Sequence, residues 1–203
     1  MPPPPEPTGR LVLVRHGETE WSRSGRHTGT TDVALTPAGE RDARGLAGRL
    51  TRFDVVLALA SPLSRARRTA ELAGFSPRVD PDLVEWDYGG YEGRTTAEVR
   101  ESVGDPSWTV FGAGVVPGDT PGETVEEVAA RASRVLERVA EPLRDGDVAL
   151  FAHGHLLRIL AATFVRQDAR FGAHLILDAG AVCVLDHERG EPAIRTWNEA
   201  AGD

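Results

Sequence analysis

The sequence predicts an α/β fold: a three-layer sandwich in which a mainly parallel sheet carries helices on both faces. Three short apolar runs, Leu11–Val14, Asp54–Ala60 and Asp147–Ala152, have the length and composition of buried strands. Segments with helical spacing of apolar residues separate these runs along the chain. Strands that alternate with helices favour parallel pairing through right-handed crossovers, which place the helices on both faces of the sheet.

Length and composition predict one soluble domain. The chain has 203 residues, of which 40% are hydrophobic and 27% charged, and it shows no internal repeat. We expect residues 1–9, MPPPPEPTG, to be a disordered proline-rich leader and residues 10–203 to be a single domain. Cys183 is the only cysteine, and neither a secretory signal nor an apolar run of roughly 20 residues is present. These observations predict a cytoplasmic protein.

The charge pattern limits the classes of partner. A net charge of −8 argues against general binding to nucleic acids or to anionic membranes. The sequence contains no lysine, so Schiff-base and P-loop lysine chemistry are excluded. Any anion site must therefore use arginine, histidine and backbone amides.

The first half of the chain contains two predicted helices. Thr36 followed by Pro37 is typical of a helix start, and apolar residues at helical spacing continue to about Arg52. A second helix is expected in residues 63–74, LSRARRTAELAG. The loop between Gly17 and Leu35 is long and polar, which in a compact domain is typical of functional segments.

The second half continues the alternation of strands and helices. Its elements, in chain order, are an extended piece near Arg78–Val84, an aromatic and acidic loop EWDYGGYEG at residues 85–93, a short helix at Thr95–Val103, an irregular lid or insert at Gly104–Gly122, a helix from Glu123, a helix from about Leu156 to Val165, and closing strands at Ala181–Leu185 and Pro192–Trp197.

Polar residues follow each of the three predicted buried strands. Arg15 and His16 follow the first, Ser61 and then Arg65 follow the second, and His153-Gly154-His155 follows the third. Because the carboxyl ends of parallel strands lie along one edge of a sheet, we expect these groups to meet. Two histidines and two arginines around one point can hold a phosphoryl group. One histidine attacks phosphorus while the arginines neutralise its oxygens and the other histidine donates a hydrogen bond.

A departing alkoxide would also need a proton. The acidic loop offers three candidates for this role, Glu85, Asp87 and Glu92, and the spacing alone does not choose among them.

A metal site is the alternative interpretation of the histidines. His153 and His155 have an alternating spacing that can ligate zinc, and His16 could join them. The adjacent arginines make a cation site electrostatically poor, so we expect no metal. His155 could also simply hydrogen-bond to backbone at the start of a helix.

Several motifs together resemble one known family. RHGET at residues 15–19 resembles the signature of the histidine phosphatase superfamily, which includes the cofactor-dependent phosphoglycerate mutases. Further similar segments follow in family order: LTPAGERDA at residues 35–43, SPLSRARRTA at residues 61–70, the acid-bearing loop that begins at Glu85, and AHGHLLR at residues 152–158. The resemblance implies a phosphoglycerate mutase-like fold and a histidine phosphatase catalytic domain.

The resemblance also implies catalytic roles. His16 would be the nucleophile that forms a phosphohistidine, and Arg15, Arg65 and His153 would complete the phosphate pocket. Glu85 would donate a proton to the leaving group and then activate water. Electrostatics supports the nucleophilic role of His16, because nearby arginines should lower the pKa of His16 and keep it neutral.

A second set of residues is expected to bind the substrate. Thr28 and Gly29 match the family loop that closes over the phosphate, and Ser22 stands where many members carry asparagine. Tyr88 could line the pocket or pack in the core. The remaining members of the set are Arg26, Gly154 and His155.

Hydrolysis is favoured over mutase activity. In the mutases the catalytic glutamate is followed by a basic pair, whereas Trp86 and Asp87 follow Glu85 here. Residues 94–122 contain only two basic residues, where the mutases supply a basic cluster, and the second-histidine motif contains HGH rather than HGN. Cofactor-dependent phosphoglycerate mutase remains the alternative. A non-catalytic binding module is less favoured because all of the essential groups are present.

The acidic loop together with AHGH is most similar to the compact broad-specificity phosphatases and to sedoheptulose-bisphosphatase-like enzymes. We therefore predict a metal-independent phosphomonoester hydrolase that needs no cofactor and acts on small phosphorylated metabolites such as sugar phosphates. The closing strands from Ala181 offer an edge at which two copies could pair as a homodimer.

Overall fold

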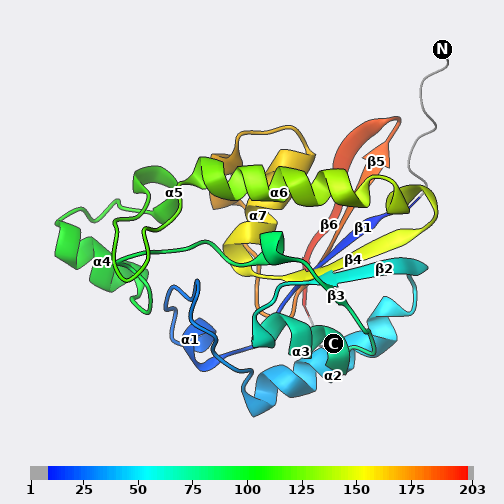
Figure 1. The fold of residues 1–203 in the computed structure, drawn as a ribbon, viewed down its shortest axis with the longest axis horizontal. Helices are drawn as coiled ribbons and strands as arrows, with labels where there is room; N and C mark the ends of the chain where they lie inside the picture. The colour runs from blue at the N-terminus through cyan, green and yellow to red at the C-terminus, as the bar shows by residue number, and fades with distance from the viewer. Residues whose placement is uncertain (1–8, 201–203) are drawn as a thin grey trace.

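The computed structural model describes residues 9–200 and contains a six-stranded sheet in the order β3-β2-β4-β1-β5-β6 (Figure 1). Its strands are β1 Leu11–Arg15, β2 Val55–Ala60, β3 Arg78–Val79, β4 Asp147–Ala152, β5 Val182–Glu188 and β6 Glu191–Glu199. The predicted leader lies outside the described residues except for Gly9, whose N–H donates to the carbonyl of Leu143 at 2.9 Å.

The three strands whose polar ends were expected to meet pair in parallel. β4 lies between β1 and β2 and runs parallel to both, and β3 runs parallel to β2. β5 pairs antiparallel with β1, and β6 antiparallel with β5. Arg189 and Gly190 connect the last two strands with φ values of 54° and 82°. Positive φ at both residues is the geometry of a two-residue type I′ hairpin.

Helices cover both faces of this sheet, so the predicted three-layer fold is confirmed (Figure 1). α2 (Pro37–Leu50) and α3 (Ser64–Leu72) cover one face, and α6 (Val125–Val139) and α7 (Gly154–Phe164) the other. The alternation along β1 explains the arrangement: Val12 and Val14 pack on the α2–α3 side, and Leu11 and Leu13 join the cluster of α6 and α7.

Local sequence determines where the long helices begin. The Thr36 hydroxyl accepts from the N–H of Gly39, and Pro37 occupies the first turn, as predicted. α2 ends at Leu50, slightly before the expected Arg52. The short elements are α1 Glu20–Arg23, α4 Thr96–Val103, α5 Val110–Ala113, and the 3-10 turns η1 Pro81–Leu83, η2 Pro142–Arg144 and η3 Ala169–His174. Of these only α4 was predicted as a helix; η1 lies within the piece that was predicted to be extended, and the others fall in segments where no helix was predicted.

Asp147 joins the amino-terminal ends of the three central strands. Its carboxylate accepts from the Arg10 backbone N–H at 2.7 Å, just before β1, and from the Asp54 N–H at 3.0 Å, just before β2. The Arg10 side chain adds hydrogen bonds of 3.1 and 2.8 Å. A nearly buried carboxylate with these partners aligns the strands at the edge of the sheet opposite to the polar strand ends.

We predict that Asp147→Asn destabilises the protein by about 2–3 kcal/mol, because the amide loses the charge and turns an N–H group toward existing donors. Urea unfolding measures this change in the free energy of unfolding. Asp145→Asn, at an exposed position two residues away, is the control and should stay close to wild type. Equal stabilities for the two variants would contradict this role of Asp147.

Candidate active site

The polar ends of β1, β2 and β4 meet at one edge of the sheet. The His16 N–H donates to the carbonyl of Ala152, and the Ser61 N–H donates to the carbonyl of Phe151, each at 3.0 Å. The ring centroids of His16 and His153 are consequently 5.2 Å apart. Residues 137 positions apart in the sequence thus share one site, in the arrangement expected from parallel pairing.

His16 is buried and held in one tautomer. Its Nδ1 lies 2.8 Å from the carbonyl oxygen of Gly17, which can only accept, so Nδ1 carries the hydrogen. In the neutral ring the lone pair is therefore on Nε2. Burial, followed by the charges of Arg15 and Arg65, lowers the pKa of His16 well below its usual value. The ring is neutral near pH 7 and can act as a nucleophile.

Arg15 presents an unsatisfied donor beside His16. Its Nε is buried and has no hydrogen-bond partner among the described residues, while Nη1 donates to the carbonyl of Leu177. The guanidinium lies against the start of α7, where a Cβ on Gly154 would be 3.4 Å from the guanidinium carbon, an ordinary van der Waals contact. Burial lowers the pKa of Arg15, and the charge of Glu85 opposes this effect. The unpartnered N–H is suited to an anionic oxygen.

Arg65 and His153 form a buried pair behind this donor. Arg65 Nε donates to His153 Nδ1 at 3.2 Å, so the hydrogen of His153 is on Nε2, which donates to Ser61 Oγ at 2.8 Å. Burial, followed by Arg65 and His16, lowers the pKa of His153 well below its usual value. The other hydrogen bonds of Arg65 are to carbonyls of one loop: Thr28, Gly29 and Thr31.

Glu85 binds the amino-terminal end of α7. One carboxylate oxygen accepts from the N–H groups of Trp86 and Leu156, both at 2.9 Å, and the other accepts from the N–H of His155 at 3.0 Å. Helix amino ends expose free N–H groups and favour negative charge. The carboxylate is thereby held within a fixed geometry at the cavity that contains His16.

The other two candidate acids have different contacts. Asp87 accepts from the hydroxyl of Thr120. Glu92 accepts the Gly29 N–H with both carboxylate oxygens at 3.0 Å. Among the contacts of the described residues, neither carboxylate contacts Glu85. Both order loops at the site.

The loop after β1 uses most of its own polar groups. Ser22 and Thr19 form a capping box, with the Ser22 hydroxyl accepting from the Thr19 N–H at 2.9 Å. Arg26 Nη1 donates to the carbonyl of Gly93 at 3.0 Å, and the Thr28 hydroxyl donates to the carbonyl of Arg26 at 3.1 Å. A Cβ at Gly29 would clash with neighbouring backbone, and this requires glycine at that position.

Aromatic rings form another wall of the cavity, with His27, Tyr88 and His155 among the lining residues. The Tyr88 hydroxyl lies 2.6 Å from His155 Nδ1, and the rings of His27 and Tyr88 are 4.8 Å apart. Burial, followed by Glu85, raises the pKa of Tyr88 well above its usual value. Burial, followed by Arg158, lowers the pKa of His155 well below its usual value, and burial lowers that of His27 to about 4. This wall is therefore neutral near pH 7.

These groups surround a cavity of about 330 Å³. Most of the predicted site residues line it: Arg15, His16, Ser22, Arg26, Thr28, Glu85, Tyr88, Gly154 and His155. Three predicted residues are not among those that line it: Gly29, Arg65 and His153.

His27, Phe111 and Arg158 line the cavity but were not predicted as site residues from the sequence. Arg158 donates to the carbonyl of Gly172 at 2.8 Å, and its guanidinium lies 4.8 Å from the centroid of the Phe111 ring. The helix pattern offered a signal for Arg158, since it lies three residues after His155 and so on the same helix face. No pattern pointed to His27 or Phe111.

Two features are absent from residues 9–200. No helix there combines the length and the apolar character that crossing a membrane requires. Within the same range, no group of three or more histidine, cysteine or carboxylate side chains is arranged to bind a metal ion.

The chain belongs to the histidine phosphatase superfamily (branch 1), whose family model matches residues 11–200. It is similar to an acid phosphatase of Mycobacterium tuberculosis, 38% identical over 89% of this chain and 88% of that protein. A sedoheptulose 1,7-bisphosphatase of Saccharomyces cerevisiae is 36% identical over 78% of this chain and 68% of that protein. The similarity also extends to a 2,3-bisphosphoglycerate-dependent phosphoglycerate mutase of Cytophaga hutchinsonii, 35% identical over 84% of each chain.

Solved structures agree with the fold. The structure of an open reading frame product of Mycobacterium tuberculosis matches with a TM-score of 0.90 and 34% identity, covering 96% of this chain and all of that one. The comparisons confirm the predicted family and the prediction that this protein is a phosphatase.

We predict that the buried neutral histidines make the protein less stable in acid. For a group whose pKa is lower in the folded state, stability is fully present above the unfolded pKa and is lost as pH falls below it. For His27 this range lies between 6.5 and about 4. The free energy of unfolding should therefore fall from about pH 6.5 to about pH 4, with each such histidine contributing up to about 1.4 kcal/mol per pH unit.

Urea unfolding of wild type and His27→Gln over this pH range measures the contribution. The variant should show a shallower pH dependence, because glutamine does not titrate. Identical slopes for the two proteins would show that His27 is not a neutral buried histidine in the folded state.

Proposed function

We propose that this phosphatase hydrolyses phosphomonoesters of small metabolites without a metal, through a phosphohistidine on His16. The observation that supports this most strongly is the joint placement of three groups on one cavity. These are the nucleophilic Nε2 of His16, the unpartnered Nε–H of Arg15 and the carboxyl group of Glu85.

In the first step, His16 Nε2 attacks phosphorus and the bond from phosphorus to the ester oxygen breaks. Arg15 donates to a phosphoryl oxygen as its negative charge is redistributed. Glu85, entering the step protonated, gives its proton to the leaving alkoxide, which departs as an alcohol. The Gly17 carbonyl accepts from Nδ1–H throughout and stabilises the imidazolium character that the ring acquires.

In the second step, the carboxylate of Glu85 takes a proton from water as the water oxygen attacks phosphorus. The bond from phosphorus to His16 breaks, inorganic phosphate leaves, and both side chains return to their starting protonation. The same carboxyl group thus serves as acid and then as base.

Arg65 and His153 support this site although they do not line the cavity. The charge of Arg65 lowers the pKa of both histidines, as the largest contribution after burial for His153. Both ring nitrogens of His153 have protein partners, so direct contact with a phosphoryl oxygen requires one of these hydrogen bonds to open.

The cavity favours hydrolysis of a small substrate over the mutase alternative. Trp86 is fully buried, with its Nε1–H bonded to the Glu123 carbonyl at 2.7 Å, and Asp87 is bound to Thr120. These two positions therefore add no cation for a substrate carboxylate. The neutral wall of Tyr88 suits an uncharged hydroxyl-bearing group such as a sugar.

We further propose one catalytic domain over residues 10–203 and a cytoplasmic location. Cys183 is buried, and burial raises the pKa of its thiol to about 12, which fits a structural cysteine. Homodimer formation through the outer edge of β6 stays a prediction, since β6 pairs only with β5 among the described strands.

Steady-state phosphate release in the presence of EDTA tests this function. The panel is p-nitrophenyl phosphate, sugar phosphates and bisphosphates, and 3-phosphoglycerate with and without a bisphosphoglycerate primer. We expect metal-independent release that His16→Ala lowers by at least about 10³-fold. Interconversion of phosphoglycerates with no release of phosphate would instead establish the mutase.

The lowered pKa of His16 predicts a second kinetic result. Because the neutral ring persists below its ordinary pKa of 6.5, kcat/KM should show no loss with a midpoint near this value as pH falls. Two substrates whose phosphate groups ionise differently separate substrate titration from that of the enzyme. An acid limb at about 6.5 for both substrates would contradict a neutral, buried nucleophile.

A further inference from the structure

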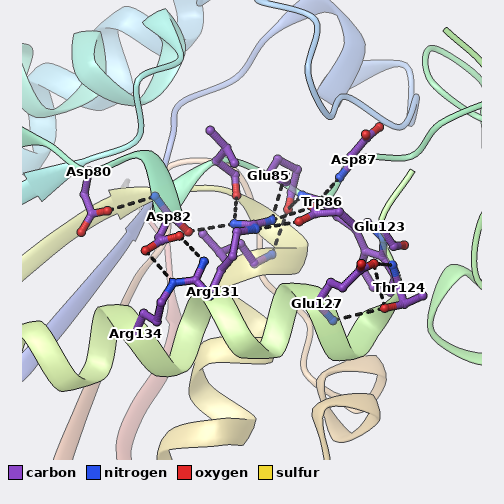
Figure 2. Close-up of polar contacts among 12 residues, drawn as sticks. Asp80, Asp82, Glu85, Trp86, Asp87, Glu123, Thr124, Glu127, Arg131 and Arg134 are labelled. Carbon is purple, nitrogen blue, oxygen red and sulfur yellow. Dashed lines mark hydrogen bonds and ion pairs between the residues drawn. The ribbon is translucent and has the colours of Figure 1, made fainter. Parts of the chain in front are cut away.

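Arg131 is a buried arginine on α6 that holds the chain segment leading into Glu85 (Figure 2). Its Nη1 donates to the carbonyls of Asp82 and Val84 at 2.8 and 3.0 Å, and Nη2 donates to the carbonyl of Glu85 at 3.3 Å. The carbonyl of Asp82 belongs to η1, and those of Val84 and Glu85 belong to the irregular segment that follows it. Burying a guanidinium without hydrogen-bond partners is unfavourable to the free energy of folding. The contacts with these carbonyls therefore stabilise Arg131 in its buried position.

Glu123 completes the arrangement from the start of α6. Its carboxylate binds Arg131 in a bidentate ion pair, Nε to Oε1 and Nη2 to Oε2, each at 2.8 Å. All five N–H groups of the guanidinium therefore have acceptors. Oε2 also accepts from the Asp87 N–H at 3.0 Å, and the Glu123 carbonyl accepts from Trp86 Nε1.

The pair thus holds the backbone on both sides of Glu85. Arg131 donates hydrogen bonds to carbonyls up to that of Glu85, and Glu123 accepts hydrogen bonds from the two residues that follow, as Figure 2 shows. The Glu85 carboxylate is separately bound by amides at the start of α7. Because side-chain position follows backbone position, a shift of the segment moves this carboxylate relative to His16.

We propose that Arg131 and Glu123 are positioning residues for the proton donor Glu85. This inference rests on the proposed function, in which Glu85 protonates the leaving group. The pair contributes to the transfer of the proton and not to the attack of His16, which follows β1 and lies outside this segment. Misplacing a proton donor by about 1 Å can cost about 10²-fold in rate.

The choice of leaving group separates positioning from general support of the fold. p-Nitrophenolate leaves without a proton, whereas the alkoxide of a sugar or glycerol phosphate needs one. A weakened fold lowers kcat/KM for both substrates alike, whereas a misplaced proton donor lowers it selectively for the alkyl phosphate.

The experiment compares kcat/KM for p-nitrophenyl phosphate and for the alkyl phosphate that wild type hydrolyses best. The variants are Glu123→Gln, which keeps the side-chain shape and one acceptor, and Arg131→Gln. Arg134→Gln is the matched control, because Arg134 also lies on α6 and pairs with Asp82 but is exposed and does not contact the Glu85 segment beyond it. Glu85→Gln is the reference for complete loss of the proton donor.

We expect Glu123→Gln and Arg131→Gln to lower kcat/KM for the alkyl phosphate by about 10-fold to 100-fold and to change that for p-nitrophenyl phosphate by less than about threefold. Arg134→Gln should leave both unchanged. Adding Glu123→Gln to Glu85→Gln should cause little further loss, because both changes remove the same contribution.

Two results overturn the proposal, and they differ in what they say about the proposed function. If Glu85→Gln is selective for the alkyl phosphate but Glu123→Gln lowers both substrates equally or neither, the positioning role is wrong and the proposed function stands. If Glu85→Gln itself shows no selectivity, the proton-donor role fails and the positioning role fails with it. Should Arg131→Gln not fold, the milder Glu123→Gln decides the matter.

Discussion

The contact between Glu85 and the start of α7 determines the geometry of the whole site. The carboxylate accepts the N–H groups of His155 and Leu156, two of the amides that every helix leaves free at its amino end. The loop after η1 is thereby fixed to the same turn of chain that follows β4 and carries His153. The residues that follow β1 and β2 donate to carbonyls of β4, so backbone hydrogen bonds connect this turn, to which Glu85 is bound, with His16.

Burial of charge around this contact determines the chemistry. Arg15 and Arg65 are both largely buried, and the negative charge of Glu85 stabilises each of them. The same burial keeps His16 and His153 neutral. The two nearby guanidinium cations add to this effect, because they oppose a further positive charge. The site therefore combines positive charge for a phosphate with an uncharged nucleophile, and this combination is what transfer of a phosphoryl group to histidine requires.

Much of this arrangement could be predicted from sequence because it depends on strand ends. The apolar runs fixed where β1, β2 and β4 stop, so Arg15, His16 and His153 were predicted to meet, and the structure brings them together. The start of α2 at Thr36 followed in the same way from local capping chemistry.

The rest depends on partners that sequence spacing does not show. Ser22 was predicted to bind the substrate and lines the cavity, but spacing did not show that its hydroxyl forms a capping box with Thr19. Arg65 was predicted to complete the phosphate pocket, but spacing did not show that its N–H groups also bind loop carbonyls more than 30 residues away. Arg131 gave no signal, because its partners in the Glu85 segment are brought to it only by packing of α6 against the sheet.

Direct identification of the phosphorylated residue tests the central claim most sharply. Wild-type protein mixed with excess substrate is quenched in alkali within one turnover, digested, and mapped by mass spectrometry under conditions that preserve phosphohistidine. We predict an acid-labile, alkali-stable phosphoryl group on the peptide that contains His16, which disappears when quenching follows complete consumption of the substrate. Phosphorylation of a different residue, or turnover with no phosphorylated peptide during the burst, would contradict it.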